Sequence, residues 1–301
     1  AIDDDNPALA VGALGLCKFA NSATEHGVSS VAWTQADGSA PPSDAQQLAA
    51  FHLGHGLRAD FGPNNLPREG GRLLAISNGT ARDASDPGSG DPGAGNKNYQ
   101  SPHAPGMPKE TAACPGITTG ECHDSIALQI AINVPSNATG FSFDSNFFSR
   151  DFPAYVCSAF NDTFFSLLLP RPMAAPDGQV SIYADGDPVS LNAAPFDVCT
   201  CMGGPPCMAG GQMYACSQGD AGLVGTGFTG AGATGWQTTT APVAPGSQIV
   251  LRLGLFDGPD GNCTSTAPPA ASRSAPSRPR SAASLSRSAP RDRRGQRRAR
   301  R

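Results

Sequence analysis

Glycine and proline recur so often in this sequence that long helices are excluded. The chain holds 36 Gly and 28 Pro among 301 residues, and both residue types interrupt helices and central strands. Hydrophobic residues still make up 39% of the chain, which is enough apolar material to build a core. We therefore exclude a helical bundle and expect short elements joined by many turns.

Five segments carry the hydrophobic pattern of β-strands. They are residues 127–134, 141–148, 163–169, 179–185 and 248–256. In ALQIAINV (127–134) and QIVLRLGLF (248–256), every second side chain is Leu, Ile or Val, which is typical of a half-buried strand. Gly, Pro, Asn and Asp separate the strands, without intervening helical patterns. The sequence therefore predicts a mainly β fold, an antiparallel, jelly-roll-like β-sandwich with long loops.

Helices are expected only near the N-terminus. Asn6 and Pro7 are typical of a helix start and predict a short helix that reaches Ala20. A further turn of helix is predicted around residues 44–53. Residues 83–109 and the Cys/Gly-rich insertion 199–216 contain few large apolar side chains. We expect the first to be a long surface loop, and the second to be held by cross-links.

The formal net charge of −4 is the sum of two unlike segments. Residues 263–301 contain eleven Arg and one acidic residue, a charge of +10, whereas residues 1–262 carry −14. This division predicts one folded β domain over residues 1–262. The basic Arg/Ser/Pro/Ala tail over residues 263–301 is expected to be disordered.

The cysteines indicate an oxidising compartment, where disulfides persist. Eight of the nine precede the tail and are disulfide candidates: Cys17, Cys114, Cys122, Cys157, Cys199, Cys201, Cys207 and Cys216. Eight cysteines allow up to four bridges, and the sequence leaves their pairing open. The ninth, Cys263, lies in the tail. The chain begins AIDDDNP and is interpreted as a mature sequence whose signal peptide has been removed, and no apolar run reaches the about 18 residues of a transmembrane segment.

Four stretches share one pattern, in order along the chain. They are GHGLRADFGPNNLPREGGRLLAISNGTAR (54–82), FSFDSNFFSRDFPAYVCSAFNDTFFSLL (141–168), LVGTGF (223–228) and GATGWQTTTAPVAPGSQIVLRLGLFD (232–257). The most specific part is the phenylalanine–aspartate strand followed by FPAYVC and FND. Over residues 8–260 the chain resembles the choice-of-anchor L domain family of bacterial surface proteins. The resemblance implies an exported β-rich domain at the cell surface, and it implies no catalytic activity.

This resemblance ends directly after Gly261. In the family, a strand ending in LFD is usually followed by an Asp-rich turn and a last hydrophobic strand. Here the chain continues as NCTSTAPPAASRSAPSRPR. Ala, Arg, Ser and Pro have codons rich in G and C, and a GC-rich gene read out of frame yields this composition. We therefore hypothesise a frameshift near codon 260.

Acidic residues at predicted strand ends and turns form a candidate calcium site. The proposed ligands are Asp144, Asp151, Asp162, Asp185 and Asp187. Calcium takes six to eight oxygen ligands, which Asp side chains and loop carbonyls at the edge of a sandwich can supply. The alternative is structural, because Asp also occupies turns by capping local backbone groups. Calcium is the only cofactor that the sequence suggests.

No motif signals catalysis or another metal. His52 and His55 form HxxH, but the Glu of the zinc-protease motif HExxH is absent and glycines disfavour a helix, so structural histidines are expected. The Cys spacing over residues 199–216 fits disulfides better than a zinc site. No GxSxG nucleophile elbow is present.

These observations predict a non-catalytic exported or cell-surface domain that serves adhesion or extracellular binding through loops at the sandwich edge. The expected partner is an extracellular ligand or surface component, and no nucleic acid is expected. Two alternatives stay open. One is a secreted hydrolase acting on glycans, which would need two carboxylates about 5–10 Å apart. The other is polyanion binding through the Arg-rich tail.

Overall fold

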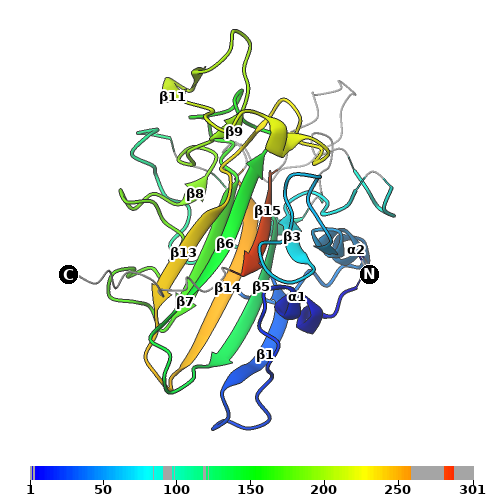
Figure 1. The fold of residues 1–301 in the computed structure, drawn as a ribbon, viewed down its shortest axis with the longest axis vertical. Helices are drawn as coiled ribbons and strands as arrows, with labels where there is room; N and C mark the ends of the chain where they lie inside the picture. Colours follow the sequence, from blue (N-terminus) through cyan, green and yellow to red (C-terminus); the bar gives the residue numbers. More distant parts are fainter. Residues whose placement is uncertain are drawn as a thin grey trace, which may run out of the picture.

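The fold is mainly β, as the sequence predicts. The computed structural model describes residues 2, 4–83, 85–90, 97, 99–117, 120 and 122–258, together with the backbone of residues 281–287. The described strands pair antiparallel in two large sheets and one small hairpin (Figure 1). No helix in this part of the chain is long and apolar enough to cross a membrane.

The first sheet has the strand order β1-β5-β14-β7-β8, with β4 paired to β5. Its strands are β1 (Gly27–Thr34), β4 (Gln100–Ser101), β5 (Cys122–Asn133), β7 (Thr163–Leu169), β8 (Val189–Ser190) and β14 (Gln248–Asp257). Strand β7 has the predicted bounds, and β14 differs from its prediction by one residue. Strand β5 begins five residues earlier than the alternating pattern, because Cys122 already pairs with β4.

The second sheet has the order β2-β3-β15-β6-β12-β9, with β13 paired to β6. Its strands are β2 (His55–Arg58), β3 (Leu73–Ser77), β6 (Gly140–Ser149), β9 (Val198–Cys199), β12 (Gly232–Ala233), β13 (Gln237–Pro242) and β15 (Ser281–Arg287). The hairpin consists of β10 (Cys207–Ala209) and β11 (Gln212–Tyr214). A single 3-10 turn, η1, covers Ala221–Leu223.

Apolar side chains from both sheets meet in one core. Leu128 and Leu253 of the first sheet belong to the same buried cluster as Ile76 and Phe147 of the second. The alternating pattern of β14 predicts that Ile249, Leu251, Leu253 and Leu255 share one face of the strand. All four side chains are buried. The two sheets therefore pack face to face, because each turns its apolar face toward the other.

Two short helices lie beside β3 (Figure 1). Helix α1 covers Pro7–Ala13 and is capped by the Asn6 side chain, which accepts a hydrogen bond from the Ala8 amide. The predicted end at Ala20 is wrong, because Gly15 has a φ of +76° and turns the chain away. Helix α2 covers Ala45–His52, within the predicted range, and Asp44 caps it.

The prediction of a strand over residues 179–185 is also wrong. This segment makes only isolated bridges, Gln179 with Leu167 and Ile182 with Pro188. A tight turn replaces the ladder, since the Tyr183 amide donates to the Asp187 carbonyl at 2.9 Å and Gly186 adopts a φ of +89°.

Part of the tail lies in a strand of the second sheet. Ser281–Arg287 form β15 between β3 and β6, drawn in red in Figure 1. The rest of the tail, from 263 to 280 and from 288 to 301, lies outside the described residues.

Candidate functional site

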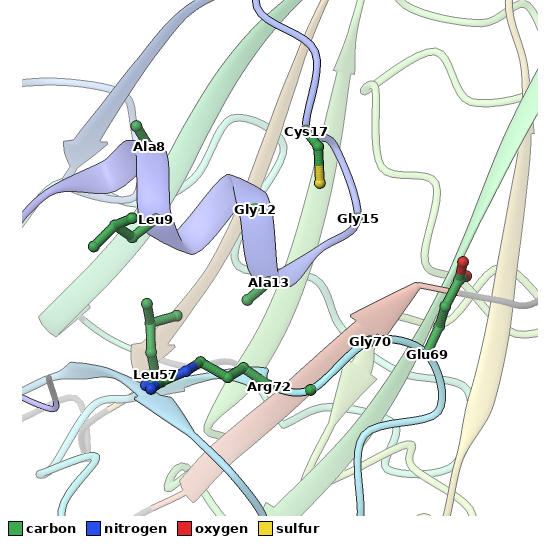
Figure 2. A pocket seen from close by; sticks show the side chains of 11 residues that line it. Ala8, Leu9, Gly12, Ala13, Gly15, Cys17, Leu57, Glu69, Gly70 and Arg72 are labelled. Atoms are coloured by element: carbon green, nitrogen blue, oxygen red, sulfur yellow. The ribbon is translucent and has the colours of Figure 1, made fainter.

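A pocket of about 600 Å³ lies between α1 and the turn formed by residues 69–72 (Figure 2). Leu9, Ala13 and the glycine of α1, Gly12, line one side, and Leu57 of β2 lines another. Volumes of about 300–1,000 Å³ with mainly apolar walls are typical of small-ligand sites. The pocket is therefore a candidate binding site.

The sequence of α1 explains the pocket's apolar wall. Ala10, Val11 and Leu14 are buried toward the core, so the opposite side of this short helix is left to face the pocket. Leu9 is 45% exposed there. A Cβ atom added at Gly12 would have no neighbour within 4 Å, so this glycine leaves space above the pocket.

Charged groups stand at the edge of the pocket. The exposed side chain of Arg72 extends toward Leu57, whereas Glu69 points away on the other side of the turn (Figure 2). The free thiol of Cys17 also lines the pocket and is exposed. The arrangement offers an apolar cavity with one cation, which suits an apolar group that carries a negative charge.

Three disulfides occur among the described residues, and they join loops and the short strands β9 and β10. They are Cys114–Cys157, Cys199–Cys216 and Cys201–Cys207. Cys17 and Cys122 are free. Burial strongly raises the pKa of the Cys122 thiol, which therefore stays protonated at neutral pH. The prediction of a disulfide-stapled domain is confirmed for six of the eight candidates, and Cys263 lies outside the described residues.

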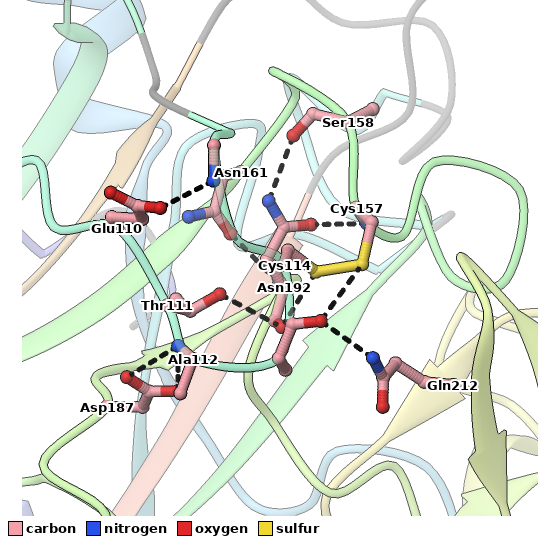
Figure 3. The surroundings of a disulfide bond; sticks show 12 residues. Glu110, Thr111, Ala112, Cys114, Cys157, Ser158, Asn161, Asp187, Asn192 and Gln212 are labelled. Carbon is pink, nitrogen blue, oxygen red and sulfur yellow. Dashed lines mark hydrogen bonds between the residues drawn. A yellow bond between two sulfur atoms is a disulfide. The ribbon is translucent and has the colours of Figure 1, made fainter.

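The Cys114–Cys157 bridge is braced by a buried asparagine, Asn192 (Figure 3). Its Oδ1 accepts a hydrogen bond from the Cys157 amide at 2.8 Å, and its Nδ2 donates to the Ser158 carbonyl at 2.9 Å. Its own amide donates to Oδ1 of Asn161 at 3.0 Å. One side chain thus joins the loop after β6 to the loop after β8.

The other two bridges hold the Cys/Gly-rich insertion, which forms the β10–β11 hairpin. Met208 and Met213 are directly paired across this hairpin and are 66% and 71% exposed, so they share its outer face. Met202 lies fully exposed in the preceding turn. The cross-links therefore present three flexible apolar side chains to solvent, and methionine is enriched on adaptable binding surfaces.

The structure does not gather the five calcium candidates into one group. Two clusters of three metal-ligating side chains occur in the described part of the chain, and neither contains any of these five residues. Asp144 of β6 is instead held by protein donors, because Nε of Arg68 lies 2.7 Å from Oδ2 and the Thr238 hydroxyl donates to Oδ1 at 2.6 Å.

The other four candidates lie in two connections, one between β6 and β7 and one between β7 and β8. Asp151 follows β6 and Asp162 precedes β7, and both are buried. Asp185 and Asp187 share a turn, in which the Asp187 carboxylate accepts a hydrogen bond from the Ala112 amide at 3.0 Å. Burial raises the pKa of Asp187, and the nearby Asp185 raises it further. The calcium site stays a prediction.

Of the two metal-ligating clusters, the cysteine one is already used in bonding. It consists of Cys199, Cys207 and Cys216, all of which are in disulfides. The second cluster brings Asp5 beside His52 and His55, the two histidines that sequence reasoning treated as structural. Sequence analysis missed Asp5 as their neighbour, because 46 residues separate it from His52 and only the fold brings them together.

His55 is the most perturbed histidine of the described residues. Its side chain is buried, and burial lowers its pKa to about 3, with His52, Arg82 and Lys97 adding a repulsive contribution. The imidazole is therefore neutral at physiological pH.

A second cavity, of about 130 Å³, is lined by two carboxylates and therefore bears on the hydrolase alternative. It is lined by Asp37 and Asp177 together with Arg171 and Arg252. Burial by itself would raise the pKa of Asp177, but the ion pair with Lys109 and the Gln179 amide outweigh it and leave the pKa lowered. A glycosidase needs one carboxyl with a raised pKa to act as the acid, and Asp177 lacks this property.

Comparisons of the chain with protein-family models, with curated proteins and with solved structures find no match.

Proposed function

We propose that this chain is a non-catalytic, exported domain of the cell surface that binds an extracellular partner through the pocket beside α1. The observation that carries the proposal is the pocket itself, whose volume of about 600 Å³ and apolar lining suit a small ligand or a protruding side chain. Arg72 at its edge favours a partner group that is both apolar and anionic.

The disulfides support export. Bridges persist in oxidising compartments and are rare in the cytosol, and three occur among the described residues of this domain. The resemblance to the choice-of-anchor L family points the same way. The stretches that carry this resemblance contain core strands of the two sheets. Residues 54–82 contain β2 and β3, residues 141–168 contain β6 and β7, and residues 232–257 contain β12 to β14.

The pocket also argues for binding over glycan hydrolysis. Glu69 is the single carboxylate among the described residues that line it. Glycoside hydrolysis needs a pair of carboxylates on either side of the scissile bond. The pocket can therefore bind an apolar group, but it lacks the acid–base pair of a glycosidase.

A fluorescence titration tests the proposal with anilinonaphthalene sulfonate, which combines an apolar ring system with an anionic group. The wild-type chain should bind one molecule saturably. A Cβ atom at Gly12 meets no atom within 4 Å, so Gly12→Leu can extend its side chain into the pocket. It should weaken binding at least about tenfold, since it removes most of the apolar contact. Arg72→Gln should weaken binding less, and more strongly at low salt than at high salt.

The matched control is Ala49→Leu, which places the same leucine side chain on the exposed surface of α2. This variant should bind the probe as the wild type does. Equal affinities for Gly12→Leu and Ala49→Leu would contradict the proposed pocket.

A further inference from the structure

Asp5, His52 and His55 converge at one point on the surface beside α2 and β2. Oδ1 of Asp5 lies 2.9 Å from Nδ1 of His52 and 3.6 Å from Nε2 of His55. All three atoms lie within 4.8 Å of one another. Asp5 precedes α1, His52 ends α2 and His55 begins β2, so three separate elements contribute to the group.

Hydrogen bonding does not account for this convergence. Nδ1 of His52 and Nε2 of His55 are both buried, and neither makes a hydrogen bond, although the Asp5 carboxylate is close to each. Unbonded buried nitrogen atoms are costly. A cation between the three atoms would satisfy both nitrogens and the carboxylate together.

The spacing fits a metal ion. Zinc is bound by His nitrogen and Asp oxygen at about 2.0–2.2 Å, so two ligands of a tetrahedral ion lie about 3.4 Å apart. The observed 2.9 Å and 3.6 Å lie on either side of this value. The third pair of atoms, the two histidine nitrogens, lies within 4.8 Å.

The ligands are held in place by residues around them. The indole of Trp33 stacks on the His55 ring, and its Nε1 donates to the Asp5 carbonyl at 3.0 Å. Arg82 donates to the His55 carbonyl at 2.5 Å and to the His52 carbonyl at 3.4 Å. Such supporting contacts orient metal ligands in known sites.

The spacing of the two histidines has a structural cause at Gly54. The Gly54 carbonyl accepts a hydrogen bond from the Ser77 amide at 2.7 Å. A Cβ atom at Gly54 would lie 2.8 Å from the Ser77 carbonyl oxygen and 2.5 Å from Nζ of Lys97. Glycine therefore allows the turn between α2 and β2 to pass close to β3, which sets His52 and His55 side by side.

We propose that Asp5, His52 and His55 bind a Zn²⁺ ion that fastens the segment before α1 to the turn between α2 and β2. Two imidazole nitrogens and one carboxylate oxygen are a zinc donor set. The Asp5 side chain is 54% exposed and that of His52 is 32% exposed, so the fourth position is open to water. The ion is thereby reachable from solvent.

Isothermal titration of ZnCl₂ into the EDTA-treated full chain tests the site. The background carries Cys17→Ser and Cys263→Ser, so that neither thiol contributes to binding. We expect one Zn²⁺ per chain. Asp5→Asn and His52→Gln should each weaken binding at least about 100-fold, because loss of a ligand costs more than the about 10–100-fold that loss of a supporting partner costs.

His26→Gln is the matched control, since His26 is exposed and lies outside the group. It should bind zinc as the background does. Circular dichroism checks that each variant keeps the β fold, and visible absorption of the Co²⁺-loaded chain reports nitrogen and oxygen coordination. The absence of saturable binding, or equal affinities for His52→Gln and His26→Gln, would overturn the proposal.

Discussion

The indole of Trp33 and the imidazole of His55 lie face to face, with ring centroids 4.0 Å apart and planes inclined by 11°. The same indole donates a hydrogen bond to the Asp5 carbonyl. One residue of β1 therefore fixes both the N-terminal segment and the first residue of β2.

Replacing Trp33 should destabilise the fold. Trp33→Leu removes the stacking contact and the bond to Asp5, and leaves a cavity in the core, so we expect a loss of about 3 kcal/mol in the free energy of unfolding. Trp236→Leu is the control, because Trp236 is only half-buried and contacts Arg68 at 5.8 Å. It should cost about 1 kcal/mol. Urea unfolding measures the stability of both variants. Equal losses would show that the contacts of Trp33 with His55 and Asp5 add nothing to the stability.

Replacing Asn192 should also destabilise the fold. Asn192→Ala leaves the part-buried Cys157 amide and Ser158 carbonyl without their side-chain partner, which we expect to cost about 2 kcal/mol. Asn137→Ala, at an exposed loop position, should change stability by less than about 0.5 kcal/mol. Thermal unfolding under non-reducing conditions compares the two. An Asn192→Ala chain as stable as the control would mean that the bonds in Figure 3 are replaced by water.

The three disulfides should differ in their contributions. Cys114 and Cys157 are 43 residues apart, whereas Cys201 and Cys207 are 6 apart. In the loop-entropy model the longer loop stabilises by about 4 kcal/mol and the shorter by about 2 kcal/mol. Paired Cys→Ser variants, compared by urea unfolding, measure this difference. The reverse order would show that native-state contacts, and not loop closure, dominate.

The elements with strong local patterns were the ones that sequence predicted. Alternation identified β5 and β14, and the Asn6 cap identified the start of α1. Strands β2 and β3 were missed because both are buried along their whole length and show no alternation. The prediction of a strand over residues 179–185 was wrong, because the alternating pattern there competes with the turn at Gly186.

The candidate sites depend on contacts that no local pattern contains. The pocket forms where α1 meets the turn at residues 69–72, which lies more than fifty positions away in the sequence. The HxxH pair was visible in the sequence, but its third member, Asp5, was not. The cysteines were recognised as disulfides, whereas their pairing required the fold.

Strand β15 is expected to matter for stability. It pairs with four residues of β3 and seven of β6, so its removal leaves two strands with open edges. A chain that ends at residue 280 should unfold at a lower urea concentration and associate through those edges. A chain that ends at residue 287 keeps β15 and should behave as the full chain. Equal stability of the two would contradict the role of β15.

The composition of β15 bears on the frameshift hypothesis. Its sequence, SAASLSR, contains Ser and Ala, and Ala is depleted in strands, although the strand lies between two others. The hypothesis predicts that another frame of the gene past codon 260 encodes a hydrophobic, Asp-bearing strand. The absence of such a strand from both other frames would falsify it.

The most direct test of the binding function is to map where an apolar anionic ligand contacts the chain. Amide chemical shifts are recorded while anilinonaphthalene sulfonate is titrated into the ¹⁵N-labelled chain. We predict that the amides of α1 and of residues 69–72 shift together and saturate with one affinity. Shifts confined to the hairpin around Met208 and Met213, with the α1 amides unmoved, would contradict the pocket as the binding site.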